Sequence, residues 1–471
     1  MPFPASRWLW QAWTVSKRER ARFVSVIQAP IKTYLYPAYG IASLGKVAVE
    51  VMLQLYLFDF YTRILGLSPI LAGLAFAVAI FWDALSDLLV SAGLFAARSR
   101  GITYTATLWS GAVLLAATTV LLFSPFQSDS TLYLFLHLLV AYVLVNTGMT
   151  LLDLPQSSLS AELSRRANER NTLLASRMGF GILGLAVGSA LPGIYLTTLS
   201  SEPTLVELAD SRRISAWVLA ALVLVTGSLT AFLLRPRERK TLQEVKSALP
   251  TWAEVKGLFR DRAFVQILCA GVIAAIGRTI NAALALMYYR FVLELSEAQV
   301  TQAIFPVFTL SIVLSIPLWI ALSKRYGKSA PAYLSVGGLG VMGIIAYPIL
   351  PAGLVWPSLI ISSIGGVLCG AVFLIDSMIT DLIDTDEVET GRRKESLYFA
   401  VWKSGLKVAR ALAFVAIGLG LQAMGLDMSR DVASESMQWG IVLLFGIAVG
   451  LCFVAASFFI WRADVPEPNE T

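Results

Sequence analysis

The sequence predicts an all-α membrane protein whose twelve spanning helices form two six-helix bundles around a central cavity. Its 471 residues are 57% hydrophobic and only 14% charged, whereas soluble domains carry about 25% charged residues. A span with its connection takes roughly 35–40 residues, so the chain has room for about twelve helices. The longest polar stretch, residues 235–262, divides the apolar segments into two sets of equal number.

Each apolar segment is long enough for a helix to cross the bilayer, which takes about 20 residues. The segments lie near residues 37–60, 70–96, 102–123, 131–152, 173–198 and 214–234, and then near 264–290, 299–322, 331–350, 356–380, 397–424 and 438–461. The domains we expect are a basic segment at 1–36, bundles at 37–234 and 263–462, a linker at 235–262, and a tail at 463–471. This layout is typical of transporters that bind solute between two halves.

Basic residues crowd alternate loops, as in Arg235, Arg237, Arg239 and Lys240 of the linker. By the positive-inside rule these loops and both termini are expected to be cytoplasmic, in an inner or plasma membrane. The net charge of +6 therefore reflects contact with the lipid bilayer and not with nucleic acid. A monomer that carries a small-molecule solute is expected.

The composition does not point to an enzyme. The three cysteines lie in apolar runs without the spacing of metal ligands or of a disulfide framework. We find no nucleophile and base pair and no nucleotide-binding loop, so no cofactor is expected apart from a coupling ion.

Three carboxylates interrupt the apolar segments. Asp83 and Asp87 directly follow the apolar stretch 70–82 within the second segment and are four residues apart, which places them on one helix face. Asp153 ends the fourth segment. Because an ionised aspartate in the middle of a membrane helix costs about 3 kcal/mol, such residues usually serve function. Paired carboxylates on an inward face suit a monovalent cation or a transferable proton, which indicates ion-coupled transport.

Three separated stretches carry a family resemblance. The first comprises Tyr39 and Gly40 with residues 60–68 and 82–87. The second comprises residues 153–163 with Asn168, Glu169, Arg170 and Arg177, and the third comprises residues 380–384 and 390–396 with Lys407. In order and spacing the chain resembles the glycoside–pentoside–hexuronide cation symporters, the melibiose-carrier group of the major facilitator superfamily. The resemblance implies the twelve-helix fold of that superfamily and transport by alternating access.

The resemblance also implies a cation site. The acid pair of the family falls on Asp83 and Asp87, its fourth-helix contributors fall on Thr150 and Asp153, and Ser86 stands where the best-known members carry Asn. The coupling ion is then Na⁺ or H⁺. Carboxylate oxygens of Asp83, Asp87 and Asp153 suit Na⁺, a hard cation, whereas proton coupling would use a buried carboxylate. The alternative is that these aspartates are structural and pair with basic side chains.

The sugar site of the family matches poorly. Lys46 is present, but Val47 replaces the Asp that follows it in the melibiose carriers, and Ser157 replaces the aromatic residue that stacks on the sugar. Arg177 and Lys407 remain. Losing groups that bond a hydroxyl is expected to redirect specificity.

Charged residues that do not match the sugar site of the family appear in other apolar segments. Lys403, Lys407 and Arg410 fall on one helix face. These bases and Arg278 favour an anionic solute, since guanidinium groups match oxyanions. The alternatives are an ionic lock between the bundles and snorkelling to the interface. The candidate substrate contacts are Lys46, Glu50, Arg177, Arg278, Lys403 and Lys407.

The loop after the tenth segment is a candidate gate. Asp384 on one side and Arg392 and Arg393 on the other could pair ionically. The alternative is a solvated run of charges.

These observations predict Na⁺- or H⁺-coupled symport of a polar organic solute, of sugar, glycoside or hexuronide type and anionic. Two alternatives stay open. A symporter of lysolipids or other amphipathic molecules would show a side opening to lipid, whereas a non-transporting membrane sensor would show a sealed acid cluster without a cavity.

Overall fold

The computed structural model describes residues 32–126, 128, 130–164, 167–196, 203–237, 252–390, 394–424 and 434–463. Within those ranges all regular secondary structure is helical, and twelve stretches are long and apolar enough to cross a membrane. The predicted twelve-helix all-α class is therefore confirmed, and the protein is an integral multi-pass membrane protein. Most of the expected N-terminal segment, linker residues 238–251 and the tail from 464 lie outside the described residues.

The first six spans begin at Leu35 and end at Leu234. Their elements are α3 (Leu35–Gly40), α4 (Ala42–Met52), the π-helical turns η1 (Leu53–Leu57) and η2 (Phe60–Ile64), α5 (Pro69–Ser99), α6 (Tyr104–Leu122), α7 (Thr131–Leu163), α8 (Ala167–Leu196) and α9 (Leu205–Leu234). A 3₁₀ turn, η3 (Arg235–Arg237), follows α9 and opens the linker.

The second six spans follow α10 (Trp252–Leu258), a short helix of the linker. Their elements are α11 (Arg262–Met287), η4 (Tyr288–Val292), α12 (Glu297–Gln299), η5 (Val300–Ile304), α13 (Phe305–Tyr326), α14 (Ser329–Ile349), α15 (Val355–Cys369), α16 (Phe373–Thr390), α17 (Glu395–Ala423), α18 (Glu435–Val442), η6 (Leu443–Ala448) and α19 (Val449–Arg462). The turns η4, η5 and η6 are π-helical.

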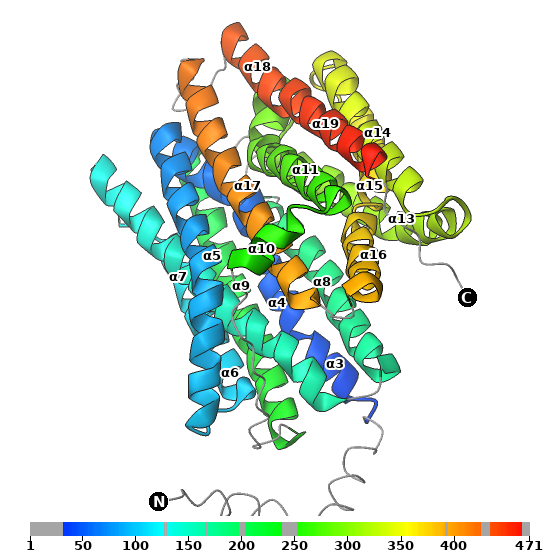
Figure 1. Cartoon of the computed structure of the whole chain (residues 1–471). Coiled ribbons are helices and arrows are strands. Elements are labelled where there is room, and N and C mark those ends of the chain that lie inside the picture. Colours follow the sequence, from blue (N-terminus) through cyan, green and yellow to red (C-terminus); the bar gives the residue numbers. More distant parts are fainter. Residues whose placement is uncertain are drawn as a thin grey trace, which may run out of the picture.

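The helices gather in two groups. Figure 1 shows α3 to α9, coloured blue to green, on one side and α11 to α19, coloured green to red, on the other, with α10 between them. The groups meet where α5 packs along α17 and where α8 packs against η5 and α13. This arrangement sets side chains of α5 and α17 face to face, although the two helices are almost 300 residues apart in the chain.

Some helices extend further than the apolar segments predict. The fourth apolar segment ends near residue 152, but α7 continues to Leu163, and α9 begins at Leu205 and not near 214. At the start of α9 a capping box explains the difference, since the Thr204 hydroxyl accepts from the Glu207 N–H and the Glu207 carboxylate accepts from the Thr204 N–H. Capping, and not hydropathy, decides where this helix begins.

Glycines allow α5 and α17 to approach closely near the end of the bundles away from the linker. A Cβ added to Gly418 would lie 2.7 Å from the Pro69 carbonyl oxygen, and one added to Gly73 would overlap the Phe414 carbonyl oxygen. Beside this contact the rings of Phe76 and Phe414 stack with centroids 4.3 Å apart. The two bundles are therefore in tight contact at this end.

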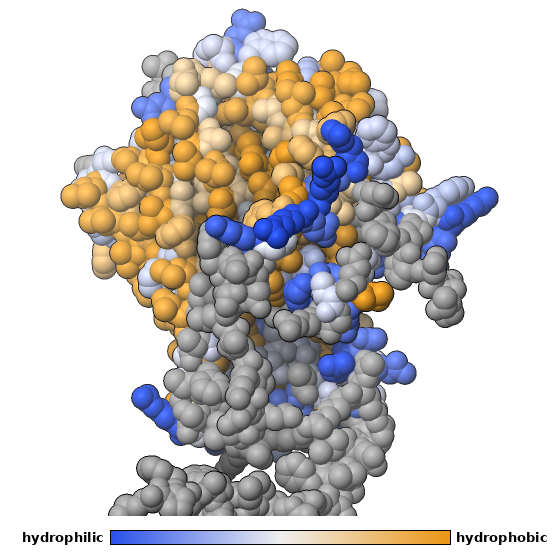
Figure 2. Space-filling view, in the orientation of Figure 1, coloured by the Kyte–Doolittle hydropathy of each residue, from blue (hydrophilic) through white to orange (hydrophobic). Residues whose placement is uncertain are grey.

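The outer surface of the bundle is apolar. Figure 2 shows hydrophobic side chains over most of the visible upper face, with hydrophilic side chains in a band from the centre toward the right and at the ends. Large side chains such as Phe81, Val225 and Leu314 are 69%, 63% and 69% exposed. Such a surface suits lipid tails, and helices satisfy their backbone hydrogen bonds without water.

Candidate functional site

The acid pair on α5 faces α7. The Thr150 hydroxyl of α7 lies 3.1 Å from Oδ1 of Asp87 and 3.5 Å from Oδ1 of Asp83. Ser86 turns its buried hydroxyl to the Asp83 carbonyl oxygen, at 3.0 Å, and lies 3.5 Å from the Thr150 hydroxyl. The structure therefore brings four of the five predicted cation-site residues together.

The positive partner of the acid pair comes from the other bundle. The Lys407 Nζ of α17 lies 3.0 Å from Oδ2 of Asp83 and 2.5 Å from Oδ2 of Asp87, and it also donates to the Asp83 carbonyl oxygen at 3.2 Å. The Asp83 residue is 8% exposed, and a charge removed from water needs a partner of opposite sign. The ammonium group thus bridges both carboxylates across the boundary between the bundles.

The carboxylate of Asp153 belongs to a different cluster. Its Oδ1 atom lies 3.0 Å from Lys46 Nζ and 2.6 Å from Arg177 Nη2, and Arg177 also donates to the Ser157 hydroxyl at 2.8 Å. Across the described ranges no group of three or more acidic, histidine or cysteine side chains converges as a metal site. The expected three-aspartate arrangement of Asp83, Asp87 and Asp153 is therefore not formed, because two bases hold Asp153.

The Lys46 ammonium also contacts Glu50, one helical turn further along α4, at 3.4 Å. The Gln54 amide in turn donates to Glu50 Oε1 at 3.4 Å. This chain of polar contacts links the Asp153 cluster to η1, where the first span contacts the second bundle.

Three predicted bases between the bundles form no hydrogen bond or ion pair with any residue in the described ranges. Arg410 acts on Glu50 and Asp83 only through its charge. Arg278 and Lys403 act in the same way on Asp376, which accepts a hydrogen bond from the Trp402 indole at 3.0 Å. These three cations are available to a negatively charged ligand.

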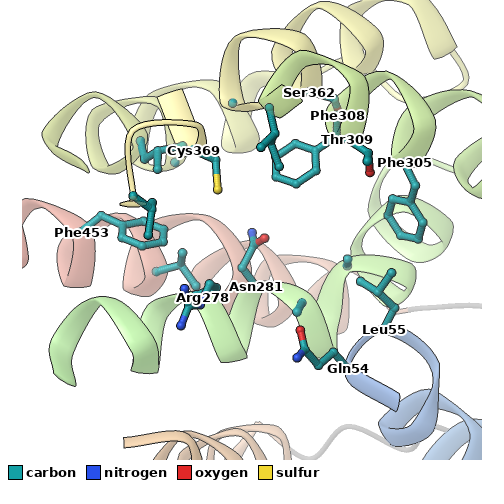
Figure 3. Close-up of a pocket in the computed structure, with 18 of the residues that line it drawn as sticks. Gln54, Leu55, Arg278, Asn281, Phe305, Phe308, Thr309, Ser362, Cys369 and Phe453 are labelled. Carbon is teal, nitrogen blue, oxygen red and sulfur yellow. The ribbon is translucent and has the colours of Figure 1, made fainter. Parts of the chain in front are cut away.

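A cavity of about 290 Å³ lies between η1, α8 and the helices of the second bundle. Arg278 and Asn281 of α11 both line the cavity. In Figure 3 the Asn281 amide points across the cavity toward the wall that carries Cys369, Thr309 and Ser362, whereas the nitrogen end of Arg278 lies on the opposite side of α11. Most of the remaining lining is aliphatic or aromatic. Small-molecule sites typically combine such an apolar lining with a few polar groups.

A family model described as an MFS/sugar transport protein matches residues 38–467. The chain belongs to this family. It is similar to an uncharacterized symporter, YjmB of Bacillus subtilis, at 22% identity over 90% of both chains. It resembles the sodium-dependent lysophosphatidylcholine symporter 1 of Gallus gallus at 23% identity, over 81% of this chain and 75% of that one. The isoprimeverose transporter of Lactiplantibacillus pentosus is 22% identical over 89% of this chain and 86% of its own.

Solved structures confirm the fold of this MFS transporter. The xylose transporter XylE of E. coli superposes with a TM-score of 0.62 at 16% identity, over 93% of this chain and 98% of that one. The nucleoside transporter NupG gives a TM-score of 0.59 at 13% identity, over 91% and 99%. The expected resemblance to symporters of the major facilitator superfamily is confirmed, and the family is one of transporters and not of enzymes.

At the end away from the linker, the MFS transporter carries a buried ion-pair cluster that sequence reasoning missed. Arg63 binds both carboxylate oxygens of Asp59, at 2.7 and 2.9 Å, and reaches Glu297 of the other bundle at 3.4 Å. Arg212 of α9 also pairs with Glu297, and its guanidinium lies 4.4 Å from the centre of the Tyr56 ring. We call these four charged residues the end cluster.

The end cluster depends on its ion pairs. Burial alone would raise the pKa of Asp59, but the Arg63 guanidinium outweighs it and holds that pKa below its usual range. The same contact raises the pKa of Arg63, against the effect of burial. A signal was present in the sequence, because Asp59 and Arg63 are four residues apart at the end of the first apolar segment, and Arg63 lies inside the stretch that carries the family resemblance.

The predicted gate at the linker end is only partly visible. Arg392 and Arg393 lie outside the described residues, and Asp384 lies on α16. Neighbouring acids of α16 pair within the second bundle, where Lys328 binds Asp381 at 2.6 Å and Lys394 binds Asp386 at 2.9 Å. The gating role of Asp384 therefore stays a prediction.

Proposed function

We propose that this transporter is a symporter in which Na⁺ or H⁺ competes with Lys407 for Asp83 and Asp87. The observation that carries the proposal is the position of the Lys407 ammonium between the two carboxylates. Asp83 is buried and Asp87 is partly exposed, so the acid pair is stabilised by a positive charge, and Lys407 is a cation tethered to the opposite bundle. When a free cation replaces it, the ionic bond between the bundles opens.

This competition explains why ion and solute move together. A cation on α5 releases the Lys407 ammonium, which can then bind an anionic solute. A bound solute in turn keeps Lys407 away from the carboxylates and leaves them open to the cation. Such coupling is reciprocal, because each ligand raises the affinity for the other by the same factor.

The ligand set for Na⁺ is the carboxylates of Asp83 and Asp87 with the Thr150 hydroxyl. The Ser86 hydroxyl contacts the Thr150 hydroxyl at 3.5 Å and so helps to position it. Oxygen ligands suit a hard cation. Proton coupling would use the same two carboxylates. Asp153 instead keeps the first bundle together through Lys46 and Arg177, because its oxygen is already engaged by both bases.

The positive-inside rule places the linker end and both termini in the cytoplasm. The end cluster and the stacked rings of Phe76 and Phe414 then close the transporter on the outer side. In this arrangement a monomer is sufficient, since both bundles come from one chain.

The solute we propose is an organic anion that binds between the bundles, near the unpaired bases Arg278, Lys403 and Arg410. Both solute classes predicted from the sequence have relatives, since one relative is an isoprimeverose transporter and another a lysophosphatidylcholine symporter. The mainly apolar lining of the cavity favours an amphipathic solute over a sugar. A non-transporting sensor was expected to have no cavity, so the presence of the cavity favours transport over the sensor alternative.

Reconstitution into proteoliposomes tests the coupling. Under an imposed Na⁺ or pH gradient, the wild type should accumulate labelled organic anions, and Asp87→Asn should not. Asp210→Asn is the matched control, because Asp210 is an exposed carboxylate 3.0 Å from Arg213 and far from the acid pair in the chain. If Asp87→Asn accumulates solute as well as the wild type does, the acid pair is not the coupling site.

A further inference from the structure

The cavity extends along the second bundle. Its lining on α11 and η4 runs from Ala274 to Tyr289, and its lining on α14 runs from Val336 to Tyr347. At 1.5 Å per residue these stretches measure roughly 22 and 16 Å. The cavity volume is about 290 Å³. Its lining along α11 is longer than the ring of a sugar, so an extended chain can lie beside it.

The two ends of the cavity differ chemically. Arg278 is the one residue of the lining that carries a full charge, and it lies near Cys369 at one end (Figure 3). Toward the other end stand Tyr289 and Ser362, whose hydroxyl oxygens lie 3.3 Å apart and so already share a hydrogen bond. From Arg278 to Tyr289 the helix rises by roughly 16 Å.

Between those ends the cavity offers few hydrogen-bonding groups that could replace the water bound to a polyhydroxylated solute. The walls are formed by aliphatic and aromatic side chains, among them Phe305, Phe308 and Phe453. Burying a hydroxyl without a hydrogen-bond partner is unfavourable, whereas burying a methylene group is favourable. The energetic balance therefore favours an alkyl chain.

We infer that this cavity binds the alkyl chain of a single-chain amphiphile whose anionic head group lies at Arg278. The inference rests on the proposed function, because it takes the cavity as the solute site, and it adds the solute class and the orientation. The head group meets a guanidinium that no described residue pairs with, and the chain lies between α11, α14 and α19. A bilayer phospholipid could offer a similar chain, and the experiment below distinguishes the two sources.

Photo-crosslinking tests the inference without any ion gradient. The transporter in lipid nanodiscs is labelled with a dodecanoate that carries a diazirine at its chain end, and the labelled peptides are mapped by mass spectrometry. We expect label in residues 339–347, displaced by dodecyl phosphate but not by glucuronate or dodecyltrimethylammonium. In parallel, a phospholipid with a chain-end diazirine should label lipid-facing residues such as Leu310 and Leu314.

Two pairs of variants sharpen the test. Ala282→Phe narrows the cavity and should abolish the label, whereas Leu310→Phe adds the same ring on the lipid side and should leave it unchanged. Arg278→Gln should weaken labelling about ten-fold or more, since a charged hydrogen bond is lost, and Arg278→Lys should retain most of it. Gel filtration of each variant verifies that it is folded.

Several results would overturn the inference. One is that glucuronate displaces the label. Another is that the phospholipid labels residues 339–347 and dodecanoate does not displace it. A third is that Ala282→Phe is labelled as strongly as the wild type. The coupling proposal is judged separately, because Asp87→Asn can lose gradient-driven uptake while the wild type and this variant are labelled alike.

Discussion

The Lys407 ammonium lies 2.5 Å from Oδ2 of Asp87, although the two residues belong to different bundles. Lys407 therefore neutralises the cation site and also joins the two halves of the transporter. An ion that binds the site must therefore break an interdomain contact, which is the requirement for coupling ion binding to conformational change.

Replacing Lys407 should separate cation binding from transport. In Lys407→Ala the acid pair has no tethered partner, so Na⁺ or H⁺ should bind at least as tightly as in the wild type, while gradient-driven solute uptake should be lost. Isothermal titration with Na⁺ and proteoliposome uptake measure the two effects. Lys403→Ala, on the same helix face but without an ion pair, should leave cation affinity unchanged. Weaker cation binding by Lys407→Ala would contradict the competition.

Asp153 should matter for stability more than for cation binding. Asp153→Asn leaves Lys46 and Arg177 without their shared carboxylate, which should lower the free energy of unfolding by roughly 1–3 kcal/mol, since these side chains are only partly buried. Thermal unfolding gives the stability, and Na⁺ titration gives the affinity. A variant that keeps wild-type stability but loses Na⁺ binding would return Asp153 to the cation site.

Weakening the end cluster should open the transporter on that side. Glu297 holds both Arg63 and Arg212 across the bundle boundary, and breaking a buried pair commonly costs 3–5 kcal/mol. In Glu297→Gln, a cysteine introduced as Leu55→Cys in a background without native cysteines should react with an impermeant thiol reagent roughly ten-fold faster. Glu294→Gln, an exposed neighbour, is the control. Equal reaction rates in the two variants would exclude a gating role for Glu297.

The stabilisation that the end cluster gives to the fold should be lost at low pH. The pKa of Asp59, which lies between the first two spans, is lowered in the folded protein. The carboxylate therefore stabilises the fold fully above its unfolded pKa of about 3.9, and this contribution is lost as the pH falls through the lower folded pKa. The difference in unfolding temperature between the wild type and Asp59→Asn should be constant from about pH 8 to 5 and shrink below about pH 4. A difference that shrinks near neutral pH would contradict this assignment.

Part of the functional site could be predicted because it is local. Asp83, Asp87 and Ser86 lie within five residues of one another on one helix, and helical periodicity places the two carboxylates on the same face. Thr150 was predicted only through the family resemblance. The end cluster was missed because Arg63 and Glu297 are 234 residues apart, and no local pattern relates the charge at the end of one span to the start of another.

The sequence by itself determined that this protein spans the membrane in twelve helices, because hydropathy and helical backbone bonding are local properties that hold for each segment alone. It also determined that acids and bases stand inside those spans. The pairing among them was decided only by the tertiary structure. Asp87 takes its partner from α17, Asp153 takes its own from α4 and α8, and Arg278 takes none among the described residues. The packing of distant helices, and not spacing along the chain, sets which charges meet, because an unpaired charge is costly away from water.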